Sequence, residues 1–104
     1  MEKRRYKRTT VYLKAERISG DEKYGVFIEN ISDKGIHMLA THARYSPGKN
    51  IDVRFHIAQR KPLILHCRVR WSCPKVPRNG LTDSIGLEII DPPPQYIEFV
   101  RTLH

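Results

Sequence analysis

Residues 50–71 read NIDVRFHIAQRKPLILHCRVRW, and apolar side chains fill alternate positions on both sides of a short linker. A period of two is typical of a half-buried β-strand, because successive side chains point to opposite faces. The apolar face would consist of Ile51, Val53, Phe55 and Ile57, then Leu63, Leu65, Cys67, Val69 and Trp71. The linker AQRKP is short enough for a hairpin, so this stretch predicts two paired antiparallel strands.

Four more segments of this kind are separated by turn sequences such as SGDEK, SDKG and SPGKN. They cover residues 9–18, 24–31, 35–41 and 84–90. Six short strands with tight turns predict a mainly all-β protein. We expect a six-stranded antiparallel β-barrel, closed or nearly closed, because closure removes exposed strand edges.

The end of the chain follows a different pattern and predicts a short C-terminal α-helix. Asp91 would cap this helix and Pro92 suits its first turn. Apolar side chains then recur at helical spacing, at Tyr96, Ile97, Val100 and Leu103. We expect this apolar stripe to lie on the barrel.

The chain has 104 residues, which predicts one domain over residues 1–104. Within it we expect a flexible basic arm at 1–8, the barrel at 9–90 and the helix at 91–104. There are 19 Lys and Arg residues against 11 Asp and Glu, a formal net charge of +8. Such a balance favours anionic partners, namely nucleic acid, nucleotides, phosphates or an acidic membrane.

The sequence shows no targeting or membrane signal. No apolar run follows the basic start, and none approaches the roughly 18 apolar residues that a spanning helix needs. Two cysteines, Cys67 and Cys73, do not make a disulfide framework. We therefore expect a cytoplasmic protein that does not insert into a membrane.

Two short motifs stand out as candidates for ligand binding. The first, Arg4-Arg5-Tyr6-Lys7-Arg8, spaces two guanidinium groups four residues apart. The second is Asn30-Ile31-Ser32-Asp33-Lys34-Gly35, which reads as a strand end and a tight turn. In a regular strand Asn30 and Ser32 share one face and Ile31 points inward, and a bulge near Glu29 would reconcile this with the preceding residues. Gly35 stands where such a turn favours positive φ.

Together these motifs resemble the PilZ domain family, whose hallmarks are RxxxR near the start and [D/N]xSxxG about two dozen residues later. RVRW at 68–71 is similar to the family's apolar-x-Trp strand ending. SIGLEII at 84–90 is similar to its late iGlxF strand, with Ile in place of the aromatic residue. The likeness covers nearly the whole chain.

The resemblance implies a barrel that binds the bacterial second messenger cyclic di-GMP and has no catalytic activity or cofactor. A guanidinium can bond guanine O6 and N7 together, or a phosphate in two places. The candidate ligand-binding residues are Arg4, Arg5, Arg8, Asn30, Ser32, Gly35 and Trp71. Because its like charges repel and the ligand would neutralise them, we expect the arm to order around the ligand and a downstream effector protein to read that change.

Several of these residues have a second interpretation. Arg5 and Lys7 read as bystanders that raise the local potential. Trp71 has the inward parity of its strand, so barrel core is its default reading, although a Trp here can sit beside the guanine in the family. Asn30 stands where many members carry Asp, and an amide oxygen accepts from one guanine donor where a carboxylate accepts from two.

Two other functions stay open. A small basic barrel could bind RNA or single-stranded DNA, but only Tyr12 and Tyr24 are expected as outward aromatic residues for base stacking. A PilZ-like domain could also dock on a protein without any ligand. Cys67 reads as core and Cys73 as loop, and neither they nor the histidines match a zinc spacing. We expect no metal site and no catalytic residues.

Overall fold

The computed structural model describes residues 8–40, 45–57, 61–74 and 83–103. Its strands and helix are β1 (Thr9–Ser19), β2 (Glu22–Ile31), β3 (Gly35–Ala40), β4 (Asn50–Phe55), β5 (Leu63–Pro74), β6 (Asp83–Ile89) and α1 (Pro94–Thr102). The predicted strands therefore all form, with ends that differ by a few residues. Because β5 continues to Pro74, Cys73 lies in a strand and its assignment to a loop was wrong.

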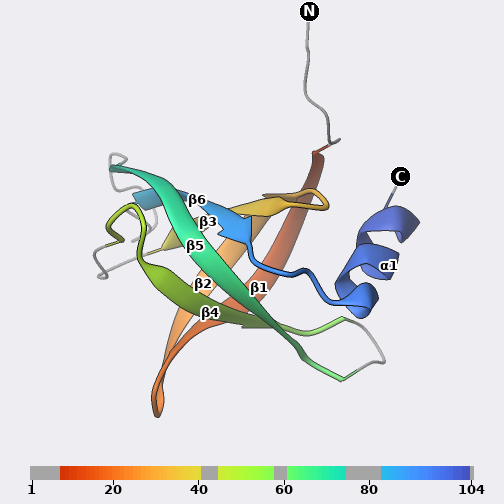
Figure 1. The fold of residues 1–104 in the computed structure, drawn as a ribbon, viewed down its shortest axis with the longest axis horizontal. Coiled ribbons are helices and arrows are strands. Elements are labelled where there is room, and N and C mark those ends of the chain that lie inside the picture. Colours follow the sequence, from red (N-terminus) through yellow and green to blue (C-terminus); the bar gives the residue numbers. More distant parts are fainter. Residues whose placement is uncertain (1–7, 41–44, 58–60, 75–82, 104) are drawn as a thin grey trace, which may run out of the picture.

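The six strands close into one antiparallel barrel in the order β1-β2-β3-β6-β5-β4 (Figure 1). The predicted pairing of residues 50–71 is confirmed, because β4 and β5 are antiparallel neighbours with Ile51 opposite Cys67. Sequence neighbours pair in β1–β2, β2–β3, β4–β5 and β5–β6. The contacts of β3 with β6 and of β1 with β4 complete the circle.

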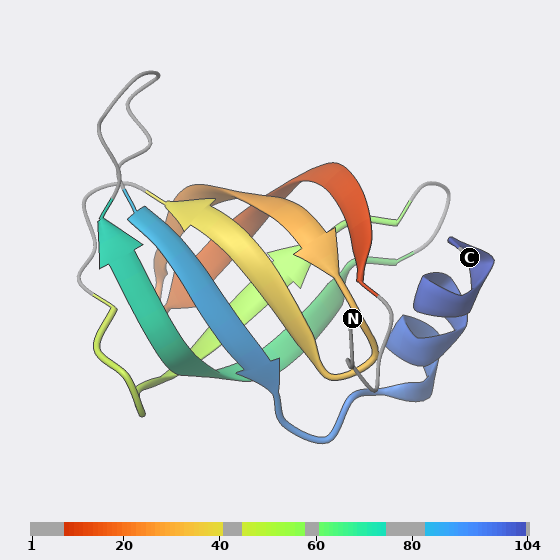
Figure 2. The same ribbon diagram turned by 90° about the horizontal axis from the view of Figure 1, so that it is seen from above.

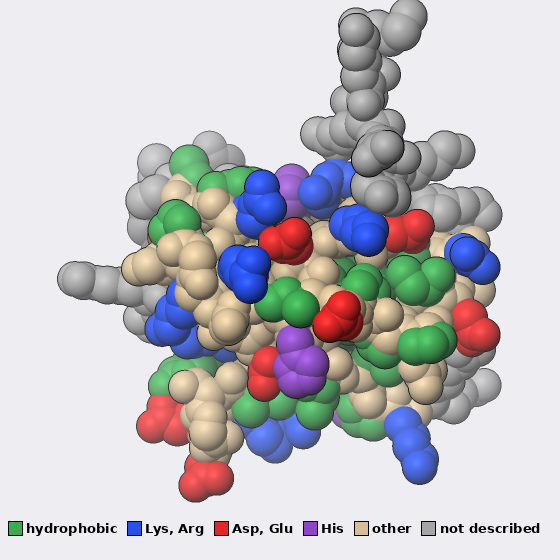
Figure 3. All heavy atoms as spheres, viewed as in Figure 1, with side chains coloured by type: hydrophobic (Ala, Val, Ile, Leu, Met, Phe, Trp, Pro, Cys, Tyr) green, Lys and Arg blue, Asp and Glu red, His purple; other side chains and the backbone are tan. Residues whose placement is uncertain are grey.

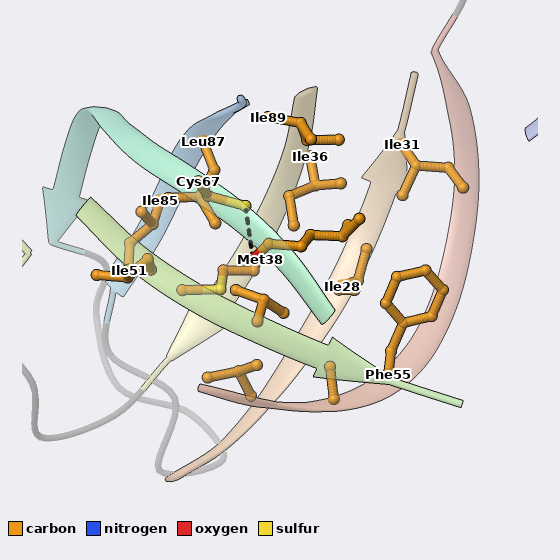
Figure 4. Close-up of a cluster of buried hydrophobic side chains, with 14 of the residues drawn as sticks. Ile28, Ile31, Ile36, Met38, Ile51, Phe55, Cys67, Ile85, Leu87 and Ile89 are labelled. Atoms are coloured by element: carbon orange, nitrogen blue, oxygen red, sulfur yellow. Dashed lines mark hydrogen bonds between the residues drawn. The ribbon is translucent and has the colours of Figure 1, made fainter. Parts of the chain in front are cut away.

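The inward positions of the alternating strands form one continuous core. Figure 4 shows buried side chains pointing into the barrel, among them Ile28, Met38 and Cys67. All three are fully shielded from solvent. The Cys67 thiol also bonds to the carbonyl of Leu65. The period-two reading of the sequence thus identified most of the core.

Besides a register shift between Thr10 and Leu13 in the β1–β2 pair, two further shifts interrupt the alternation, and both lie near the candidate site. One falls between Ile28 and Asn30, where the sequence called for a bulge near Glu29. It leaves both Ile28 and Ile31 buried. The second falls between Val69 and Trp71 and was not predicted. Each shift reverses which face the following residues occupy.

Helix α1 begins later than the sequence suggested. Its N-cap is Pro93, in an extended conformation, and Pro94 occupies the first turn. Asp91 was predicted to cap the helix, but instead it adopts a positive φ of 48° in the connection from β6. The helix cannot start at Pro92 because a residue that precedes a proline is disfavoured in the helical region.

The apolar face of α1 packs on the barrel as predicted. Tyr96 and Val100 are fully buried, and the ring of Phe55 in β4 meets Tyr96 edge to face at 6.3 Å. Figure 2 shows α1 beside the end of the barrel where β1 begins and where β2 turns into β3. No helix within the described ranges is long and apolar enough to span a bilayer.

The opposite end of the barrel holds a buried cation. Arg17 in β1 is 8% exposed. Its guanidinium carbon lies 5.0 Å from the ring centre of Tyr45 and 5.8 Å from that of Tyr24. Such contacts offset part of the cost of burying a charge. This end is built from different residues than the end that carries the two sequence motifs.

Candidate ligand-binding site

The first motif reaches the described part of the chain through Arg8. Arg4 and Arg5, together with the rest of the arm up to residue 7, lie outside the described residues. Arg8 directly precedes β1 and is partly buried. Its position therefore decides whether the two motifs lie at the same place.

Strand pairing brings the two motifs together. The start of β1 lies against the end of β2, with Thr9 opposite Ile31 and Thr10 opposite Asn30. The guanidinium Nη1 of Arg8 donates a hydrogen bond of 3.1 Å to Oδ1 of Asn30. Residues 22 positions apart thus share one polar contact at one end of the barrel.

Ser32 is buried within the turn and is not presented outward. It is 3% exposed, and its backbone N–H donates to the carbonyl of Gly35 over 2.9 Å. Its hydroxyl donates to the same carbonyl over 3.3 Å. The sequence placed Ser32 beside Asn30 on one face, whereas the structure uses its hydroxyl to close the turn between β2 and β3.

Gly35 is needed for close approach and not for a left-handed backbone. The positive-φ glycines of the described chain are Gly20 and Gly48, so the expected positive φ at Gly35 was wrong. A β-carbon on Gly35 would lie 2.6 Å from the carbonyl oxygen of Leu87 in β6. It would also lie 3.7 Å from Nη2 of Arg8, which places that guanidinium directly beside the turn.

Helix α1 supports the same turn from inside. The hydroxyl of Tyr96 donates a 2.6 Å hydrogen bond to the carbonyl of Ser32. Burial raises the pKa of Tyr96 far above that of a free tyrosine, while the nearby charge of Arg8 opposes this shift. The turn is thus fixed by its own hydrogen bonds, by β6 and by α1.

Trp71 lies on the outside of the barrel, so its default reading as core was wrong. The register shift after Val69 turns it outward, and it is 40% exposed. Its indole covers Gly86 of β6, because a β-carbon there would lie 2.3 Å from the ring. Trp71 of β5 lies opposite Gly86 of β6. A glycine within the strand 84–90 was therefore the one sign of this packing in the sequence.

His37 also belongs to the site, although the sequence analysis did not predict it. Its Nδ1 lies 3.1 Å from the amide nitrogen of Asn30. Its ring meets that of Trp71 edge to face, with centres 5.1 Å apart and planes at 74°. Four side chains therefore form a line across the outer face of the barrel, each in contact with the next: Arg8, Asn30, His37 and Trp71. We call these four residues the surface row.

Further cations lie beside the surface row, on β5. Arg70 and Arg68 approach the carboxylate of Glu88 in β6, at 3.5 and 4.0 Å. Glu88 is paired with Gly35 across the β3–β6 ladder. Figure 3 shows Lys and Arg side chains with acidic ones among them over the region where β5 and β6 lie. This side of the site is cationic but partly neutralised.

Within the described ranges, no three His, Cys, Asp or Glu side chains are grouped as metal ligands. Cys67 is buried and Cys73 exposed, and neither forms a disulfide within the described part of the chain. What the surface row offers is hydrogen-bond donors, a flat aromatic ring and positive charge. These groups suit an anion that carries a planar base.

A family model described as the PilZ domain matches residues 2–103. The chain belongs to the PilZ domain family. The match includes both motifs and the strands that bring them together. No curated protein compared with the chain matches it significantly.

Several solved structures share this fold at low sequence identity. The inhibitor of motility MotI/DgrA of Bacillus subtilis is similar with a TM-score of 0.78 and 17% identity, covering 99% of this chain and 50% of that one. The PilZ domain of Escherichia coli YcgR, solved with c-di-GMP, has a TM-score of 0.75 and 12% identity, covering 98% and 92%.

The MrkH–c-di-GMP complex of K. pneumonia has a TM-score of 0.72 and 14% identity, covering 99% of this chain and 50% of that one. The chain therefore spans about half the length of MotI/DgrA and MrkH, and nearly all of the isolated YcgR domain.

Proposed function

We propose that the chain is a cyclic di-GMP receptor without catalytic activity, which binds the dinucleotide at the surface row and the adjacent turn. The hydrogen bond between Arg8 and Asn30 carries this proposal, because it brings the ends of both motifs to one place. Membership of the PilZ family and the complexes of similar folds with c-di-GMP support it.

The residues divide into two roles. Arg8, Asn30 and Trp71 offer a guanidinium, an amide and a partly exposed ring to the guanine and phosphate groups. Ser32 and Gly35 shape the turn that holds Asn30 in place. Arginine suits this ligand better than lysine, because its planar fork bonds two acceptors at once and stacks on purines.

The remaining arm residues are within reach of the same place. Arg4 lies four positions before Arg8, a distance of at most about 14 Å for an extended chain. Clustered like charges repel one another, and a ligand with two phosphates would neutralise them. We infer that Arg4 closes over the bound dinucleotide and that Arg5 adds to the potential.

Ligand binding would be relayed to an effector protein through the elements that contact the turn. Tyr96 links Ser32 to α1, and the N–H of Ile89 donates to the carbonyl of Lys34 in the turn. A shift of the turn on binding would therefore move both α1 and the end of β6. The effector would recognise this end of the molecule together with the ordered arm.

Calorimetric titration with three ligands tests the proposal. We expect micromolar or tighter binding of cyclic di-GMP and at least tenfold weaker binding of cyclic di-AMP, which has the same backbone charge but no guanine. A single-stranded oligonucleotide tests the nucleic-acid alternative, which predicts strongly salt-dependent binding. Equal affinity for both cyclic dinucleotides, or binding of the oligonucleotide alone, would contradict the proposal. If none of the three ligands gives detectable binding heat, the result would favour a protein-docking role.

A further inference from the structure

The amide of Asn30 is held between two partners on neighbouring strands. Its oxygen accepts from Arg8, which precedes β1, and its nitrogen lies 3.1 Å from Nδ1 of His37 in β3. Asn30 directly follows the register shift in β2. Because such a shift changes the face that the next residue occupies, the side chain of Asn30 lies on the outer face with the surface row. Both ends of one amide are therefore engaged at the centre of the site.

Hydrogen-bond chemistry permits one arrangement of these three groups. A guanidinium only donates, so Arg8 requires the amide oxygen of Asn30. The amide nitrogen also only donates, so Nδ1 of His37 must accept from it. A neutral imidazole that accepts at Nδ1 carries its proton on Nε2. His37 thus has to be neutral, and in this tautomer, for the amide to present its oxygen to Arg8.

We propose that His37 is a positioning residue of the ligand site, a role that rests on the proposed function. It fixes the orientation of Asn30 so that an amide presents the same acceptor to Arg8 that a carboxylate would present at this position. The pairing lets the chain carry Asn in the first position of the second motif. It also makes ligand binding depend on the protonation state of His37.

Protonation reverses the hydrogen-bonding role of Nδ1. The imidazolium donates at both nitrogens, so Asn30 must either lose this bond or turn its oxygen toward His37 and its NH2 group toward Arg8. The charged groups on the neighbouring elements are of both signs: Arg8 before β1, Glu29 in β2, Arg70 in β5 and Glu88 in β6. Affinity for cyclic di-GMP should therefore be highest with His37 neutral and should fall as the pH drops below its pKa.

The experiment measures the dissociation constant for cyclic di-GMP at pH 8.0 and pH 5.5. For the unmodified chain we expect affinity to fall about three- to tenfold, the value of one hydrogen bond. His37→Gln keeps an acceptor that does not titrate, so it should bind equally well at both pH values. In Asn30→Asp the carboxylate accepts from both Arg8 and a protonated His37, so the acid loss should disappear there as well.

A matched control separates this effect from the general rise in positive charge. His56 is exposed and follows β4, a strand that contains no residue of the surface row and pairs with neither β2 nor β3, so His56→Gln should keep the acid loss of the unmodified chain. The proposal is overturned if His37→Gln retains that loss, or if the unmodified chain binds more tightly at pH 5.5. The second result would mean that His37 acts as a cation toward phosphate.

A second measurement does not depend on the ligand. The ¹⁵N shifts of His37 in the free protein at pH 8.0 should report the tautomer protonated at Nε2, and Asn30→Ala should remove that preference. Protonation at Nδ1 would overturn the positioning role even if the ligand binds. Absence of cyclic di-GMP binding at both pH values, with the expected tautomer present, would overturn the proposed function and would leave only the orientation of Asn30 by His37.

Discussion

The hydroxyl of Tyr96 in α1 donates a 2.6 Å hydrogen bond to the backbone carbonyl of Ser32, 64 residues earlier in the chain. Both groups are buried. This contact makes the C-terminal helix part of the support for the ligand-binding turn, so α1 does more than cover the barrel.

Tyr96→Phe tests that support. The substitution keeps the ring but leaves the carbonyl of Ser32 without this donor, which should lower the free energy of unfolding by about 1–3 kcal/mol. Urea denaturation followed by circular dichroism measures the change. The control is Tyr12→Phe, because Tyr12 is 83% exposed and its substitution should change stability by less than about 0.5 kcal/mol. Equal effects in the two variants would show that the hydrogen bond does not stabilise the turn.

Gly35→Ala tests the close approach of β3 to β6. The new β-carbon would lie 2.6 Å from the carbonyl oxygen of Leu87, so the backbone must move. We expect a loss of about 1–3 kcal/mol of stability, measured by thermal or chemical denaturation. Gly25→Ala is the matched control, since nothing lies within 4 Å of its added carbon and its φ is not positive. A loss in Gly25→Ala as large as that in Gly35→Ala would contradict this explanation.

Gly86→Ala should displace Trp71 from its place on the sheet. The added carbon would lie 2.3 Å from the indole, and a side chain at the surface can swing away. We expect the emission of this only tryptophan to shift to longer wavelength, as the ring enters water, with little loss of secondary structure. Unchanged emission would mean that the indole does not lie over Gly86.

The two cysteines should differ sharply in reactivity. Burial raises the pKa of the Cys67 thiol to about 12, so almost no thiolate is present at pH 8. Cys73 is exposed on β5. When the native protein is labelled with a disulfide reagent, one thiol per molecule should react fast, and Cys73→Ser should abolish this reaction. The second thiol should react only after denaturation. Two fast equivalents in the native state would contradict the burial of Cys67.

Period-two alternation predicted the barrel because nearly every strand buries one face. The inward residues of β4 and of β5 up to Val69 were all identified in this way. The PilZ motifs added the expectation that the two motifs converge around one ligand, and in the structure Arg8 of the first motif hydrogen-bonds to Asn30 of the second. Alternation predicts the strands β1 and β2 but does not fix the register of their pairing, which shifts between Thr10 and Leu13, so it could not show that these two side chains touch.

Each residue whose role was predicted wrongly or missed has its own physical cause. Trp71 was assigned inward because a bulge, which reverses the parity, leaves no clear mark in the letters VRW. Gly35 was explained by backbone conformation, whereas the close approach of Leu87 is a contact across strands. His37 had no visible partner in the sequence, since its contacts with Asn30 and Trp71 come from two other strands. Asp91 failed as a cap because three successive prolines delay the helix.

Arg8→Ala tests the central claim most directly, by calorimetric titration with cyclic di-GMP. Loss of its guanidinium should weaken binding by roughly 5- to 150-fold, the equivalent of about 1–3 kcal/mol for an arginine contact with guanine. Lys23→Ala removes the same charge from the far end of the β1–β2 hairpin, where Lys23 lies opposite Ile18, and should leave the affinity within about twofold. An affinity in Arg8→Ala equal to that of Lys23→Ala would contradict a ligand site built around Arg8 and Asn30.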